Sequence, residues 1–182
     1  MNKTLSIINF LFIGLFSAQS YVIGDSQSFL LAENSVHTKI FPSLAKVGIG
    51  VSELNQMLEQ SPVHEEVKNI FISIGVNDNY FDKGINKLIA NLERVFPNSY
   101  LFAIKGSYGW GNVQGVNTQT PRYIEYYKKF KNSRIYVIQK DVGFGDPHNN
   151  KWEYKQIGDF IDYIVWKNHM REKEKNKGQN GG

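Results

Sequence analysis

Residues 21–28 read YVIGDSQS, an apolar, β-rich run that passes directly into a glycine–aspartate–serine turn. Short runs that are continuously apolar rather than alternating are typical of strands buried on both faces of a parallel sheet. Three similar runs follow, at Ile70–Gly75, Tyr100–Ile104 and Arg134–Ile138. A fifth strand is expected over Lys39–Val47, at an edge of the sheet, because Pro42 cannot donate a ladder hydrogen bond.

Helical patterns separate these strands, at Val51–Gln60, Ile85–Phe96, Pro121–Phe130 and Trp152–Met170. Strands that alternate with helices imply right-handed βαβ crossovers. We therefore predict one α/β domain, a three-layer α/β/α sandwich around a mostly parallel, flavodoxin-like five-stranded sheet. The aromatic residues of the third helix are spaced for one face and are predicted to pack in the core: Tyr123, Tyr126, Tyr127 and Phe130.

The composition is that of an ordinary globular chain. Of 182 residues, 41% are hydrophobic and 21% charged, which argues against disorder, and the formal net charge is +4. Much of the positive charge lies near the C-terminus, where it alternates with glutamate, as in a solvated helix end. We therefore expect no nucleic-acid partner. The chain has no cysteine, which excludes disulfides, thiolate catalysis and Cys-ligated zinc.

No cofactor or metal is expected either. The chain contains no phosphate-binding glycine loop of a common type. Asp141, Asp146 and His148 share one loop, but this loop lacks the second histidine or spaced acidic set that would hold a cation.

The N-terminus has the pattern of a secretory signal peptide. Lys3 precedes an apolar run over 5–16, and Ala18-Gln19-Ser20 forms a small-x-small cleavage site. We expect residues 1–20 to be removed and the protein to be secreted or periplasmic, without stable membrane insertion after cleavage. An uncleaved leader would instead anchor it to a membrane. Residues 21–170 would form the domain, and residues 171–182 a charged, flexible tail ending in glycine.

Three loops that follow predicted strands carry residue types suited to nucleophilic catalysis. Ser26 opens a helix directly after a strand, where the first-turn N–H groups and the helix dipole favour an oxyanion. Asn77 follows another strand, and the neighbouring Asp78 could cap the helix after it. His148 is the one histidine of four in a strand-end loop with carboxylates close by, and it could serve as the base that a nucleophilic serine needs.

In this order and spacing, Gly24-Asp25-Ser26, Gly75-x-Asn77-Asp78 and a late Asp/His pair resemble the SGNH (GDSL-type) hydrolase family, with Gly50 matching its intervening glycine. The resemblance implies that Ser26 attacks an ester carbonyl, that His148 is its base, and that the Ser26 N–H, the Gly50 N–H and the Asn77 side chain form the oxyanion hole. Asp25 is expected to shape the turn.

One position departs from the family pattern. The family usually places its Asp three residues before the His, where this chain has Gly145. Asp146 is the predicted orienting carboxylate because it shares the short Gly-Asp-Pro-His turn with the base. Asp141, or a serine–histidine dyad, remains an alternative.

The loop 105–119 is rich in glycine and carries Tyr108 and Trp110, a combination suited to a substrate wall for sugar rings. The predicted function is therefore a serine-dependent carboxylic-ester hydrolase that removes O-acetyl groups from a carbohydrate through an acyl-enzyme. Alternatives are a lysophospholipase or thioesterase, or a catalytically inactive binding module of the same fold. The oligomeric state is left open.

Overall fold

The computed structural model describes residues 20–81, 83–105, 121–131, 133–139 and 151–179. The strands are β1 (Ser20–Gly24), β2 (Lys39–Ala45), β3 (Asn69–Ser73), β4 (Tyr100–Ile104) and β5 (Tyr136–Ile138). The helices are α2 (Ser26–Glu33), α3 (Val51–Gln60), α4 (Ile85–Val95), α6 (Pro121–Lys131) and α7 (Lys151–Gln179). Within these ranges, no helix combines the length and the apolar character needed to cross a membrane.

The five strands form one sheet in the order β2-β1-β3-β4-β5, and every neighbouring pair is parallel. The predicted α/β fold is confirmed, and β2, which contains Pro42, lies at an edge as expected. Three strands are shorter than predicted. β2 ends at Ala45 rather than at Val47. β3 ends at Ser73 rather than at Gly75. β5 begins after Ile135, whose N–H bonds the Ser133 side chain in a turn.

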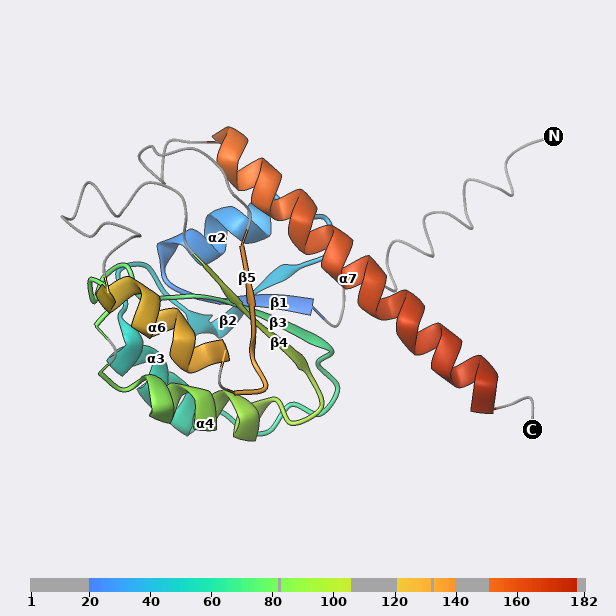
Figure 1. The fold of residues 1–182 in the computed structure, drawn as a ribbon, viewed down its shortest axis with the longest axis horizontal. Coiled ribbons are helices and arrows are strands. Elements are labelled where there is room, and N and C mark those ends of the chain that lie inside the picture. Colours follow the sequence, from blue (N-terminus) through green and yellow to red (C-terminus); the bar gives the residue numbers. More distant parts are fainter. Residues whose placement is uncertain (1–19, 82, 106–120, 132, 140–150, 180–182) are drawn as a thin grey trace.

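Helices cover both faces of the sheet (Figure 1). α3, α4 and α6 lie on one face, and α2 and α7 lie on the other. Each face has its own apolar core, one including Leu54, Leu88 and Phe130 and the other including Phe71 and Ile157. The four aromatic residues of α6 are all buried, which confirms that they serve packing: Tyr123, Tyr126, Tyr127 and Phe130.

The last helix is longer than the sequence pattern predicted. α7 continues beyond Met170 to Gln179, so residues 171–179, expected to be a flexible tail, are helical. The reason is local: residues 171–177 read REKEKNK, and arginine, glutamate and lysine are good helix formers even without an apolar face. This end of α7 projects past the sheet (Figure 1).

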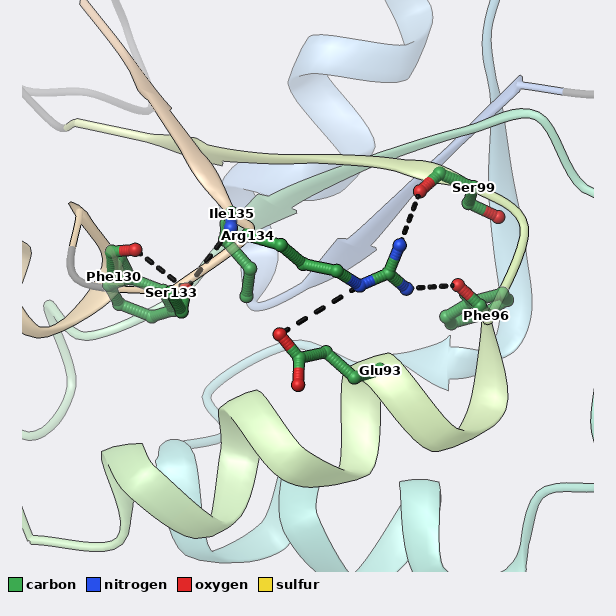
Figure 2. Close-up of polar contacts among 7 residues, drawn as sticks. All are labelled: Glu93, Phe96, Ser99, Phe130, Ser133, Arg134 and Ile135. Atoms are coloured by element: carbon green, nitrogen blue, oxygen red, sulfur yellow. Dashed lines mark hydrogen bonds and ion pairs between the residues drawn. The ribbon is translucent and has the colours of Figure 1, made fainter.

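The Arg134 side chain connects the segment before β5 to the end of α4 through hydrogen bonds and an ion pair (Figure 2). Its guanidinium donates to the carbonyl oxygens of Phe96 and Ser99, at 2.7 and 3.2 Å, and its Nε lies 3.8 Å from a carboxylate oxygen of Glu93. A cation suits this place because the last carbonyls of a helix carry partial negative charge and lack intrahelical partners. The contact joins β5, at the edge of the sheet, to the helical layer.

Candidate active site

The strand order reverses between β1 and β3. The chain passes from β1 outward to β2 on one side, whereas β3, β4 and β5 follow one another on the other side. Such a reversal leaves a crevice at the carboxyl ends of the two central strands, where ligands of open α/β sheets bind. The Ser26 turn follows β1 and the Asn77 turn follows β3, so both lie at this crevice.

The two strand ends approach each other closely. The Asp25 N–H donates to the Ser73 carbonyl at 3.0 Å, and Gly24 has a φ of +122°. A Cβ atom at Gly24 would lie 1.9 Å from the Ser73 oxygen, so only glycine fits here. The glycine before the Asp-Ser pair is therefore required for the Ser26 turn to lie against the end of β3.

Ser26 is the first residue of α2 and is half-buried. Asp25 is the N-cap, and its carboxylate accepts a hydrogen bond from the Gln27 N–H at 3.0 Å. This arrangement places the Ser26 hydroxyl at the positive end of a helix that follows directly from a buried strand. Asp25 thus shapes the turn, as expected.

Asp25 is buried, with 1% of its surface exposed. Burial raises the pKa of its carboxyl from 3.8 to about 7, the Gln27 hydrogen bond partly opposes this shift, and the nearby Asp78 adds to it. A carboxyl that titrates near neutral pH therefore lies directly beside the predicted nucleophile.

The loop after β3 is tied to the N-terminus of α3. The Asn77 side-chain amide donates to the Ile49 carbonyl at 2.9 Å, and the Asp78 carboxylate accepts from the Val51 N–H at 2.6 Å. A Cβ atom at Gly50 would lie 2.3 Å from the Asp78 carboxylate, which explains why glycine stands at the N-cap of α3. Asp78 therefore caps the helix before it in the chain, whereas sequence reasoning expected it to cap the helix after it.

The structure thus places Ser26, Gly50 and Asn77 in three adjoining loops at the carboxyl edge of the sheet. Ser26 and Gly50 are half-buried, and Asn77 is exposed. The remaining predicted site residues lie outside the described residues, namely Tyr108, Trp110, Asp146 and His148, and so do Asp141 and Gly145.

The other histidines lie elsewhere in the fold. His37 follows the far end of the 8-residue helix α2, about 12 Å long. The His64 ring stacks on Phe96, at the end of α4. His169 is next to Asn168, which contacts Asn69 at the start of β3, the opposite end of that strand from Asn77. This leaves His148 as the candidate base.

Sequence reasoning missed a support beneath the Asn77 loop. The buried Tyr126 hydroxyl donates to the Ile74 carbonyl at 3.0 Å, and a Cβ atom at Gly75 would lie 2.6 Å from that hydroxyl. Burial raises the pKa of Tyr126 well above its usual value, so it remains a hydrogen-bond donor. Gly75 was the one sequence feature that pointed to close packing here. The residue that packs against it, Tyr126, belongs to α6, which is distant in the chain, so no local pattern identifies the contact.

Sequence reasoning also missed the backbone conformation of this loop. Asn79 and Tyr80 have φ values of 49° and 56°, a left-handed conformation that two successive non-glycine residues rarely share. In the described part of the chain, no group of three His, Cys, Asp or Glu side chains is placed to hold a metal ion.

No protein-family model matches the chain, and no curated protein matches it. Among 10 solved chains that do match is the C-terminal catalytic domain of peptidoglycan O-acetyltransferase A (OatA) from Streptococcus pneumoniae, determined with a methylsulfonyl adduct. The two share 13% identity with a TM-score of 0.53, over 85% of this chain and 96% of that one. The likeness establishes a shared fold across nearly the whole domain.

Proposed function

We propose that this protein is a serine-dependent esterase of the SGNH type that removes O-acetyl groups from a carbohydrate. The observation that carries the proposal is that the loops of Ser26, Gly50 and Asn77 adjoin at the topological switch point. These loops pack so closely that a Cβ atom at Gly24 or Gly50 would clash with its neighbours. The fold shared with a catalytic domain described as a peptidoglycan O-acetyltransferase supports acetyl chemistry on a glycan.

In the proposed reaction, the Ser26 hydroxyl oxygen attacks the ester carbonyl while His148 takes its proton. The carbonyl oxygen becomes an oxyanion, held by the Ser26 and Gly50 N–H groups and the Asn77 amide. The bond to the sugar oxygen then breaks, and His148 returns the proton to the leaving alcohol. Water attacks the acetyl-serine by the same route, which releases acetate and restores Ser26. Asp146 orients the imidazole.

Acetyl transfer is a second candidate because the structural neighbour is described as an acetyltransferase. The two reactions share the acyl-enzyme and differ in the acceptor, which is water in one and a sugar hydroxyl in the other. The products separate them. Hydrolysis yields free acetate alone, whereas transfer yields an acetylated oligosaccharide that mass spectrometry detects when a hydroxyl acceptor is added.

Covalent trapping tests the proposed nucleophile. A fluorophosphonate should modify Ser26, located by peptide mass, and Ser26→Ala should abolish both labelling and hydrolysis of chromogenic acetate. Ser28→Ala is the matched control, since Ser28 lies in the same turn but is fully buried. Labelling retained in Ser26→Ala would disprove the assignment. Chromogenic esters of increasing chain length separate an acetyl preference from lysophospholipase or thioesterase activity, and no hydrolysis of any ester indicates an inactive binding module.

We also propose that the protein is exported, on the basis of the leader pattern in residues 1–20. The N-terminal sequence of the protein recovered from secreting cells tests this. Cleavage after residue 20 would remove Ser20, the first residue of β1, and leave Tyr21–Gly24 of that strand at the new N-terminus. An intact leader in the membrane fraction would indicate an anchor, and an intact leader in the cytosol would contradict export.

A further inference from the structure

A cavity of about 710 Å³ adjoins the candidate active site. It is lined by one side of α3, from Ser52 to Glu59, by the start of α4, and by the loop that follows β3. Asn77, the predicted oxyanion donor, lines it as well, so the cavity and the catalytic crevice share one residue. Pockets of this volume hold ligands of the size of a few sugar rings.

The chemistry of the lining selects a neutral, hydroxyl-rich ligand. Two lysines are balanced by two carboxylates, and one pair, Lys87 and Glu59, is in contact at 2.5 Å. Asp78 is already bonded to the Val51 N–H. The remaining polar groups of the lining are mainly side-chain amides and a hydroxyl. These groups can both donate and accept hydrogen bonds, as sugar hydroxyls require. The polar side chains of this kind are Ser52, Gln56, Asn77 and Asn79. Asn55 also lines the cavity, but it is buried and its amide is already bonded to Gly84 and Asn91.

Phe81 adds an aromatic surface. It lines the cavity, and 56% of it is exposed although it is a large apolar side chain. The Arg122 guanidinium lies over its ring, 4.5 Å from the centroid, which fixes the ring and leaves its other surface for a ligand. An exposed, fixed aromatic ring beside amides suits the apolar face of a sugar.

The loop over residues 77–81, in which Asn79 and Tyr80 have the left-handed conformation, carries several of these lining residues. Tyr80 is 5% exposed and packs against Tyr123 and Tyr126, at 4.7 and 5.5 Å between ring centroids, and this packing holds it and Asn79 in the left-handed conformation. Such backbone strain is concentrated at functional sites. Asn79 lines the cavity, and its Oδ1 is buried without a hydrogen-bond partner.

We propose that the cavity between α3 and α4 is a glycan subsite that binds a neutral stretch of the acetylated carbohydrate and directs its ester across Asn77 toward Ser26. The inference rests on the proposed function and deepens it. It places glycan recognition on the side of α3 and α4, in addition to the wall expected from Tyr108 and Trp110.

Binding is tested without catalysis. Chitotriose, cellotriose and xylotriose are titrated into the isotope-labelled full-length Ser26→Ala variant, and amide NMR signals are followed. At least one trisaccharide should shift the side-chain amide signals of Asn77, Asn79 and Gln56. If none of them shifts these signals, or if the shifts lie elsewhere, the subsite is wrong.

Two variants sharpen the test. Phe81→Ala should weaken trisaccharide binding about 5- to 10-fold, from the loss of a ring contact. The control Tyr136→Ala, at a side chain 57% exposed on β5, should leave binding unchanged. Asn79→Gly should weaken binding while the melting temperature stays equal or rises, because glycine relieves the strain. A structural role alone would lower the melting temperature and leave binding intact, which would contradict the proposal.

Failure of the glycan subsite can be distinguished from failure of the proposed esterase function. If trisaccharides bind at the cavity but the wild type hydrolyses no ester, the subsite stands and the esterase assignment fails. If chromogenic acetate is hydrolysed at Ser26 but no trisaccharide shifts the cavity amides, the esterase stands and the subsite is overturned.

Discussion

Replacing Asp25 with asparagine should remove a large pH-dependent contribution to the stability of the protein. Asparagine keeps the N-cap of α2, since its side-chain oxygen can accept the same Gln27 N–H bond and it caps helices about as well as aspartate. What it removes is the buried ionisable group. The substitution therefore isolates the titration of Asp25 from its capping role.

The raised pKa sets the size and sign of the effect. The folded state holds the Asp25 proton to a pKa of about 7, against 3.8 when the carboxyl is solvated. Each pKa unit corresponds to about 1.4 kcal/mol, so the difference amounts to about 4 kcal/mol. Because the folded state binds the proton more tightly, this contribution is fully present below pH 3.8 and is lost as the pH rises to about 7. The wild type should lose stability over this window relative to Asp25→Asn.

Urea unfolding followed by circular dichroism measures this difference. At about pH 4 the two proteins should differ in their free energies of unfolding by under about 1 kcal/mol, and at about pH 8 Asp25→Asn should be more stable by up to roughly 4 kcal/mol. Asp25→Ala is the control, because it loses both charge and cap and should lie about 1 kcal/mol below Asp25→Asn at every pH. A constant difference between wild type and Asp25→Asn across the range would refute the reasoning.

Three further predictions concern other parts of the structure. Asn77→Ala should lower kcat about 10²-fold or more with little change in KM, as steady-state kinetics on chromogenic acetate would show; a change in KM alone would make it a binding residue. Asp146→Asn should reduce kcat by about 10⁴-fold while Asp141→Asn changes it little, and the reverse result would make Asp141 the orienting carboxylate. Arg134→Ala should lower the free energy of unfolding by about 1–2 kcal/mol through the lost carbonyl bonds, whereas Glu93→Ala should cost under about 0.5 kcal/mol, because exposed ion pairs contribute little. If urea denaturation showed equal losses for Arg134→Ala and Glu93→Ala, the carbonyl hydrogen bonds of Arg134 would not be the main contribution.

The fold could be predicted because its signals are local. Each buried strand is a continuous apolar run, and each amphipathic helix repeats with the helical period, so neighbours along the chain reveal them. The helix over Val51–Gln60 was predicted with its observed bounds, and Pro42 identified the edge strand. The end of α7 was not predicted, because residues 171–179 extend a helix through propensity rather than apolar periodicity.

The candidate site could be predicted only in part. The sequence placed Ser26 and Asn77 at strand ends, and the order β2-β1-β3 makes those ends neighbours. The partner of the Asp78 carboxylate, the N–H of Val51, could not be predicted, because the two residues meet only when the loop after β3 folds onto α3.

By itself, the sequence determined the α/β class, the parallel strands and the serine turn, since each depends on hydrophobic period or turn chemistry within a few residues. The tertiary structure alone decided the raised pKa of Asp25, the left-handed loop at Asn79 and the cavity between α3 and α4. These properties arise from desolvation and close contact between segments distant in the chain. Their energies depend on distance in space, which the order of residues does not contain.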